Sequence, residues 1–334
     1  MMYINFELTS EPNSKSFQEK HMSQFEQGHA LIVGVGADLP CTISDVSAVA
    51  GVLSNPDRCG YPEKQVQLLT SKNSTSQRIQ DEIKKLQATC TADSTVVVYF
   101  SGHGYSLTTT IGTAHFLMPF GYDVADLATT ALLGDIFMAE LDKIPSRKML
   151  IILDCCHAGG IDSKKSTETI ATKAPMPPNT AAFLAEGRGR AIIASSRANE
   201  LSYAGKPYSA FTLALIESFS GIGVAKDDGF VRIADMALHT REKVPQRTND
   251  KQHPTFNFEQ SDNFRVAFYA GGDTNPKELS FDYEPEIEMV PGTMHGTAVT
   301  QIADHGGVAI SGNASGNIIV TGDRNKVGKM RKNK

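Results

Sequence analysis

Short apolar runs that carry almost no charge recur along the chain, and they limit its fold more than any other feature. The clearest are His29–Val35, Thr95–Phe100, Met149–Leu153 and Arg190–Ala194. Runs of this length without apolar–polar alternation are typical of strands buried on both faces, as in parallel sheets. Each run is far too short to span a bilayer.

Segments with helical spacing lie between these runs. Val46, Val49 and Leu53 share one face of a helix predicted over 44–53, and Ser44 is expected to cap it. Further helices are predicted at 74–88, 133–141 and 208–219, and in the second part of 230–244. Strands that alternate with helices predict an α/β fold with a mostly parallel sheet and helices on both of its faces.

The predicted sheet has six strands. Gln65–Leu69 joins the four apolar runs, and Phe264–Tyr269 is expected to be the last strand. A short hairpin is expected around His115–Met118, and a short strand at the start of 230–244.

Reactive side chains follow two of the predicted strands. One run is followed by Ser101–Gly104 (Ser-Gly-His-Gly), and another by Asp154–Gly160 (Asp-Cys-Cys-His-Ala-Gly-Gly). The carboxyl ends of parallel strands meet at one edge of a sheet, which is where open α/β sheets place their sites. A thiol beside an imidazole can become a nucleophilic thiolate. The N–H of Gly104 and that of the nucleophile are candidate oxyanion donors.

Composition sets limits on the partners and the compartment. The formal net charge is −5, which argues against nucleic acid and against an anionic membrane as main partners. No basic segment followed by an apolar stretch begins the chain, so no signal peptide is predicted. Five cysteines in such a chain indicate a reducing compartment, and we expect a cytoplasmic protein.

The two motifs together resemble those of the caspase-like cysteine peptidases, closest to the metacaspase and bacterial orthocaspase branch. The resemblance covers residues 28–270, and His103 lies 53 residues before Cys156. The caspase signature Gln-Ala-Cys-x-Gly is absent, whereas the metacaspase form Asp-x-Cys-His is present. The resemblance implies a caspase-like fold, with His103 as general base and acid and Cys156 as nucleophile. Cys155 then takes the place of a small buried residue.

The resemblance also implies where the substrate binds. Asp154 matches an acidic residue in the pocket for the side chain before the cleaved bond, which would favour Arg or Lys. Glu200 could add negative charge to this pocket, or it could be a solvated loop residue. Arg197, if it faced inward, would favour acidic substrates instead, so acidic specificity stays open as an alternative.

Self-cleavage is a further implication of the resemblance. Related enzymes are often activated by a cut in a loop between the two halves of the domain, and the polar loop 161–187 is the candidate here. Cleavage could follow Lys164, Lys165, Lys173 or Arg188. The alternative is a surface loop that is never cut.

No metal or cofactor is predicted. Many metacaspases carry acidic residues after the catalytic histidine and bind calcium, but residues 105–119 contain none. A hard cation needs several oxygen ligands, usually with carboxylates among them. Calcium therefore lacks support from this loop, and no Cys/His spacing typical of zinc occurs.

The ends of the chain differ from its centre. Residues 1–27 are expected to form an extension, 28–270 the peptidase domain, 271–290 a linker, and 324–334 a basic disordered end. Between them, residues 291–323 contain similar Gly- and Asn-rich β-branched stretches, which predict a small β-rich repeat tail. The tail resembles signalling motifs of bacterial defence proteins, so residues 296–323 could bind a receptor. A structural cap is the alternative.

The function expected from this resemblance is a cysteine endopeptidase that cuts proteins and peptides after Arg or Lys, as a regulated bacterial cell-death or antiphage effector. A catalytically silent caspase-fold scaffold that acts through its tail is the alternative. Monomer and dimer both stay open.

Overall fold

The computed structural model describes residues 24–109, 112–158, 190–197, 200, 202–258, 263–279, 283–285, 309–311, 318–321 and 326–328. Predictions that fall on other residues lie outside the described part of the chain. These include residues 1–23, the repeat at 296–303, and all four candidate cleavage positions at 164, 165, 173 and 188.

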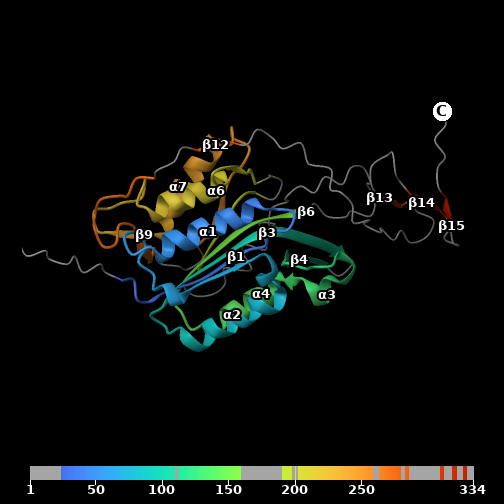
Figure 1. Ribbon diagram of the computed structural model, residues 1–334, viewed down its shortest axis with the longest axis horizontal. Coiled ribbons are helices and arrows are strands. Elements are labelled where there is room, and N and C mark those ends of the chain that lie inside the picture. Colours follow the sequence, from blue (N-terminus) through green and yellow to red (C-terminus); the bar gives the residue numbers. More distant parts are fainter. Residues whose placement is uncertain are drawn as a thin grey trace, which may run out of the picture.

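A mixed, mostly parallel sheet forms the centre of the molecule (Figure 1). Its main path runs β2-β1-β3-β6-β7-β10, and every neighbouring pair is parallel except β7 and β10. The strands are β1 (Gly28–Gly34), β2 (Val66–Thr70), β3 (Thr95–Thr109), β6 (Lys148–Ala158), β7 (Arg190–Ala194) and β10 (Thr255–Asn257). The predicted α/β class with a six-stranded core sheet is confirmed.

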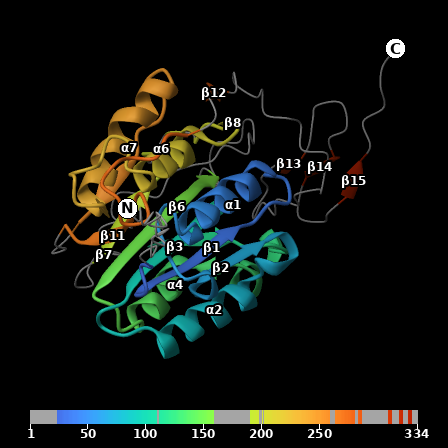
Figure 2. The same cartoon turned by 60° about the vertical axis from the view of Figure 1, so that its left-hand side comes forward.

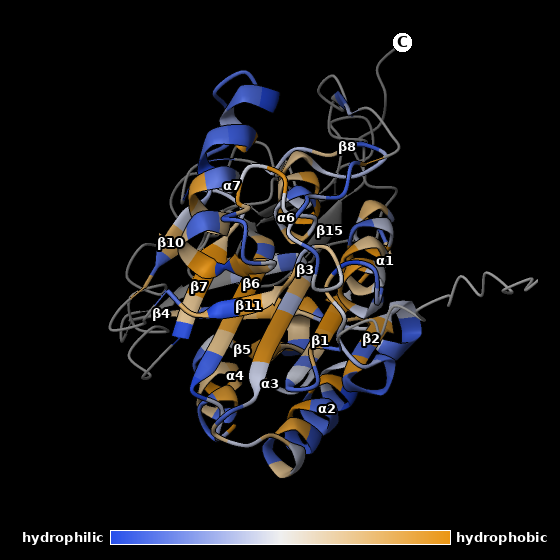
Figure 3. Ribbon diagram, turned by 90° about the vertical axis from the view of Figure 1, so that its left-hand side faces the viewer, coloured by the Kyte–Doolittle hydropathy of each residue, from blue (hydrophilic) through white to orange (hydrophobic). Residues whose placement is uncertain are grey.

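Helices cover both faces of the sheet (Figures 1 and 2). On one face lie α1 (Cys41–Ser54), α6 (Ala210–Phe219) and α7 (Ile233–Arg247), and on the other lie α2 (Ser76–Thr89) and α4 (Gly134–Asp142). The apolar strands between these layers stand out in Figure 3. Because successive strand residues point to opposite faces, Leu150 and Ile152 enter one core and Ile151 and Leu153 the other. This double burial explains the uncharged runs in the sequence.

Beside the main path, β3 forms an antiparallel hairpin with β4 (Gly112–Met118), as the sequence predicts around 115–118. β5 (Leu132–Leu133) adds to the outer side of β4, after the short helix α3 (Leu127–Thr130). This hairpin continues β3 beyond the point where β1 ends.

The predicted last strand does not belong to the main sheet, which corrects the prediction. β11 (Arg265–Phe268) exists, but it pairs with β9 (Phe230–Arg232) in a separate two-stranded sheet. The main sheet instead ends with β10, which is antiparallel to β7. β10 is only three residues long and half-buried, so it lacks the apolar run that reveals the inner strands.

The helix caps also differ in part from the prediction. Ser44 lies inside α1, which begins at Cys41 after Pro40 without a side-chain cap. α2 is capped by Thr75, whose hydroxyl accepts from the N–H of Arg78, and α6 by Ser209, whose hydroxyl accepts from the N–H of Thr212.

The linker after β11 packs on the domain. β12 (Glu284–Pro285) pairs antiparallel with β8 (Gly205–Lys206). In the tail, β13 (Ala309–Ser311), β14 (Ile318–Thr321) and β15 (Lys326–Gly328) pair antiparallel in that order, as a hairpin arrangement rather than stacked parallel rungs. None of the helices in the described part of the chain combines the length and the apolar character that a membrane span requires.

Candidate active site

The two motifs lie side by side at the carboxyl edge of the sheet. β1 ends opposite Ser101 and β7 ends opposite Leu153, but β3 and β6 continue together beyond both. In this extension the parallel register pairs His103 with Cys156. Neighbouring strands lie about 4.8 Å apart, so the backbones of the two predicted catalytic residues are adjacent. The described motif residues, 101–104 and 154–158, are thus parts of the strands, not turns that follow them.

The imidazole of His103 has a carboxylate partner that the sequence reasoning missed. Its Nε2 lies 2.8 Å from Oδ2 of Asp38, which is in the loop after β1. The side chain of His103 is 15% exposed and that of Asp38 is 39% exposed. The hydrogen bond with His103 lowers the pKa of Asp38. Its place in the sequence was the one signal for this contact, because Asp38 follows a predicted strand at the edge of the sheet where the motifs meet.

Asp154 lies one residue past the end of β7 and is completely buried. Its Oδ1 accepts a hydrogen bond of 3.0 Å from the hydroxyl of Ser202, and its Oδ2 accepts one of 3.5 Å from the hydroxyl of Tyr99. The Tyr99 hydroxyl also lies 2.9 Å from that of Thr212 on α6. Asp154 is therefore held by hydrogen bonds, one of them through Tyr99, which also contacts α6.

A second buried carboxylate, Asp45, belongs to the same region. Asp45 lies on α1 and accepts a 3.0 Å hydrogen bond from the N–H of Ser209. Burial raises the pKa of Tyr99 well above its ordinary value, and the charges of Asp154 and Asp45 raise it further. The sequence did contain a signal, because Asp45 occupies the apolar stripe of its helix with Val49 and Leu53, at four-residue spacing.

Glu200 has close partners of its own. Its carboxylate accepts a hydrogen bond of 2.7 Å from the backbone N–H of His253. The ring Nδ1 of the same histidine lies 2.8 Å from the other carboxylate oxygen. Arg197 forms an ion pair with it at 3.5 Å, with the arginine side chain 57% exposed. The role of Glu200 in substrate binding stays a prediction.

Gln252 ties the segment that carries Ser202 to the sheet. This fully buried side chain donates to the carbonyl of Ser195 at 2.8 Å and accepts from the N–H of Tyr203 at 2.8 Å. It also lies 3.4 Å from the hydroxyl of Ser202, which contacts Asp154, and no motif in the sequence pointed to Gln252.

Further motif residues are Cys155, Gly104, Cys156 and His157. Cys155 is 3% exposed, packs in the core that faces α2 and α4, and is not part of a disulfide. Gly104 is paired with Leu117 in β4 and with His157 in β6, so its N–H lies between two strands. Its oxyanion role stays a prediction. The side chains of Cys156 and His157 lie outside the described part of the structure.

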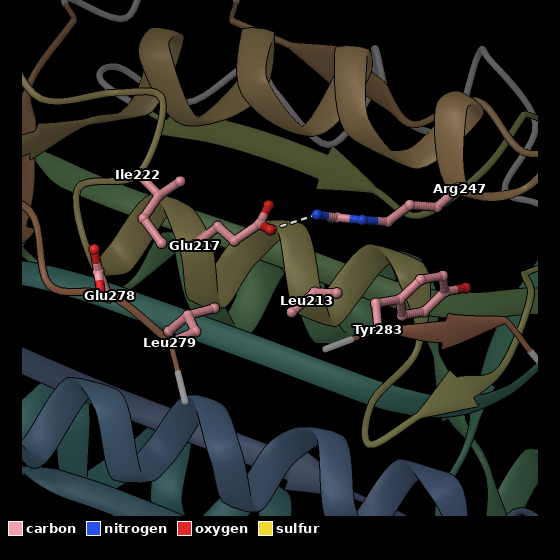
Figure 4. Close-up of a pocket in the computed structure, with 7 residues that line it drawn as sticks. All are labelled: Leu213, Glu217, Ile222, Arg247, Glu278, Leu279 and Tyr283. Atoms are coloured by element: carbon pink, nitrogen blue, oxygen red, sulfur yellow. Dashed lines mark hydrogen bonds and ion pairs between the residues drawn. The ribbon is translucent and has the colours of Figure 1, made fainter. Parts of the chain in front are cut away.

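A hollow of about 360 Å³ lies elsewhere, between α6, the end of α7 and the linker (Figure 4). None of the motif residues that the structure describes lines it. Glu217 and Arg247 form an ion pair on its wall, as the dashed line in Figure 4 shows. Within the described residues, no group of three or more His, Cys, Asp or Glu side chains is placed to hold a metal ion.

Comparison with known proteins completes the picture of the site. A search of curated proteins gives no match. Among solved structures, a structural-genomics protein from Geobacter sulfurreducens is 20% identical, with a TM-score of 0.48 over 69% of this chain and 92% of that one. The family model described as caspase domain matches residues 27–265, which include both motifs and the strands that carry them. The chain belongs to the caspase-domain family.

Proposed function

We propose that the protein is a cysteine endopeptidase in which Cys156 is the nucleophile and His103 is the general base and acid. The observation that carries this proposal is the register of β3 and β6, which sets the two residues directly opposite each other. Membership of the caspase-domain family supports the same reaction class.

In this mechanism His103 takes the proton of the Cys156 thiol. The thiolate attacks the carbonyl carbon of the scissile bond, and the carbonyl oxygen gains the negative charge. When this intermediate collapses, the C–N bond breaks and the imidazolium gives its proton to the leaving amine. Water, deprotonated by His103, then hydrolyses the thioester and restores the thiol.

We propose that the enzyme cuts after Arg or Lys. Two carboxylates, Asp154 and Asp45, are buried around Tyr99 near the carboxyl end of β6, which supports a pocket for a cation. An incoming guanidinium would take over from the Ser202 hydroxyl as the donor to Asp154. An acidic side chain there would meet like charge.

The direct test is turnover of fluorogenic peptides that end in Arg, Lys, Asp or Asn, with EDTA and with added calcium. We expect Arg and Lys peptides to be cut, and Cys156→Ala to abolish turnover. Cys155→Ala is the matched control. Cys155 packs in the core, so this variant should keep the activity of the wild type. Activity that survives Cys156→Ala would contradict the mechanism. Preference for Asp peptides would contradict the assignment of Asp154 to a pocket for Arg or Lys.

The biological role we propose is that of a cytoplasmic cell-death or antiphage effector of the metacaspase type, activated through loop 161–187 or through a receptor bound by residues 296–323. The resemblance of the motifs and of the tail supports this role. Mass mapping of purified wild-type protein tests the first route. We expect cuts after Lys164, Lys165, Lys173 or Arg188, and none in Cys156→Ala. An intact loop in an active enzyme would show that self-cleavage is not required.

A further inference from the structure

We propose that Asp38 is the positioning residue of this site, and that its carboxylate fixes the ring of His103 in the tautomer and orientation that serve Cys156. The inference rests on the proposed function and adds a third side chain to it. It starts from a contact between two elements that are 65 residues apart in sequence.

The tautomer follows from the chemistry of the contact. The pKa of Asp38 is lowered, first by its hydrogen bond with His103, so this carboxylate is ionised at neutral pH and can only accept. Nε2 of His103, 2.8 Å away, must therefore carry the proton that it donates. In the neutral ring the unprotonated nitrogen is then Nδ1, which leaves Nδ1 to take the thiol proton.

The loop that carries Asp38 is built to hold it in place. Ala37 has a φ of +55°, in the left-handed region, which costs about 1 kcal/mol for a residue with a Cβ. The N–H of Leu39 donates to the carbonyl of Gly36 at 2.9 Å, and the hydroxyl of Thr42 accepts from the N–H of Gly36 at 2.9 Å. A fixed loop distinguishes this pair from a mobile surface ion pair.

The approach of this loop to β3 is equally close. The N–H of Val35 donates to the carbonyl of Ser101 at 3.0 Å, and a Cβ on Gly102 would lie 2.6 Å from a methyl group of Val35. Only glycine at 102 lets the loop reach the strand at this distance. Among the described residues, the titratable groups that face Asp38 are His103 on β3 and Tyr122 after β4. Burial raises the pKa of Tyr122, and the charge of Asp38 raises it further.

The experiment compares Asp38→Ala and Asp38→Asn with wild type. Asp93→Asn is the matched control, because Asp93 is exposed just before the start of the same strand. With an Arg peptide we expect kcat to fall about 100-fold in Asp38→Ala, with KM within about twofold, because a positioning group acts on the reacting geometry. The rate of Cys156 alkylation by iodoacetamide, located by mass spectrometry, should fall with it.

The two substitutions distinguish control of the His103 tautomer by Asp38 from a purely structural role of Asp38 in the loop. An asparagine keeps the shape of Asp38 but can donate to Nε2 and so favour the wrong tautomer, as known for the Asp-to-Asn change in the serine protease triad. Asp38→Asn is therefore expected to lose at least as much kcat as Asp38→Ala. A residue that only supports the loop would lose less in the isosteric variant. Full kcat in both variants would overturn the proposal.

A readout that does not need peptidase activity keeps this proposal separate from the function. Nitrogen-15 chemical shifts of the His103 ring should show a protonated Nε2 in wild type and a mixture of tautomers in Asp38→Ala. If no peptide is cut by wild type, the proposed function fails, but these shifts still decide the role of Asp38. Identical shifts in both proteins would overturn it.

Discussion

Close packing next to His103 makes Gly102 a sensitive position of the site. Its missing side chain allows the loop after β1 to lie against β3, and that loop brings Asp38 to the imidazole. The distance between Nε2 and the carboxylate therefore depends on a residue that takes no part in the chemistry. Small displacements of a catalytic group are costly, since a shift of about 1 Å can lower the rate about 100-fold.

Gly102→Ala tests this dependence. The added Cβ would overlap Val35, so the loop has to move, and we expect a loss of stability of about 1–3 kcal/mol together with a drop in kcat. Gly51→Ala is the matched control, because a Cβ there meets nothing within 4 Å and the helix gains from alanine. Thermal unfolding and peptide turnover measure both effects. An unchanged kcat in Gly102→Ala would show that the loop position is not critical.

At the scale of elements, α6 and α7 are joined by a partly buried ionic cluster. The carboxylate of Glu217 on α6 lies 2.8 Å from Nε2 of His239 and forms an ion pair with Arg247, both on α7. Burial by itself would raise the pKa of Glu217, but the hydrogen bonds from His239 and Arg247 outweigh it, so the pKa lies below its ordinary value. This cluster fixes the helix whose first turn contacts Tyr99 and Asp45.

Glu217→Gln should therefore lower the free energy of unfolding by about 2 kcal/mol at pH 7. Because the folded pKa is lowered, the contribution is complete above the ordinary range near pH 4 and is lost as pH falls through the folded pKa. Urea unfolding at pH 7 and at pH 3 measures the difference, which should shrink in acid. Glu242→Gln, an exposed change on α7, is the control and should have no effect. A difference that grows in acid would contradict the assignment.

Some of these elements could be predicted from the sequence, and others could not. The inner strands were predictable because both of their faces are buried, which leaves a continuous apolar run, as in Met149–Leu153. β10 was missed because an edge strand of three half-buried residues leaves no such run. The position of His103 opposite Cys156 could be predicted, because both motifs follow strands of the sheet. The contact of Asp38 with His103 could not be predicted, because it depends on a loop conformation set by Ala37 and Gly102.

At the scale of the whole molecule, residues beyond the predicted domain boundary at 270 contact the domain. The N–H of Lys277 donates to the carbonyl of Ser220 at 2.9 Å, and the guanidinium of Arg58 donates to the carbonyl of Glu278 at 3.1 Å. Leu279 and Tyr283 pack against the core formed with α1 and α6. The described linker residues, 271–279 and 283–285, thus pack on one side of the domain.

Two truncations test this boundary. A chain that ends after residue 285 keeps these contacts, whereas one that ends after residue 270 exposes the apolar surface beneath Leu279 and Tyr283. We expect the shorter chain to be less stable by about 3 kcal/mol, from the burial of two large apolar side chains. Thermal unfolding compares the two. Equal melting temperatures would place the boundary at 270.

The most direct measurement of the central claim is covalent trapping of the nucleophile. Wild-type protein is treated with an electrophilic peptide ketone that carries a terminal arginine, and the modified residue is identified by mass spectrometry. The account predicts a single label on Cys156, slowed strongly in His103→Ala and unaffected in Cys155→Ala. A label on Cys155, or a rate on Cys156 that does not change without His103, would contradict it.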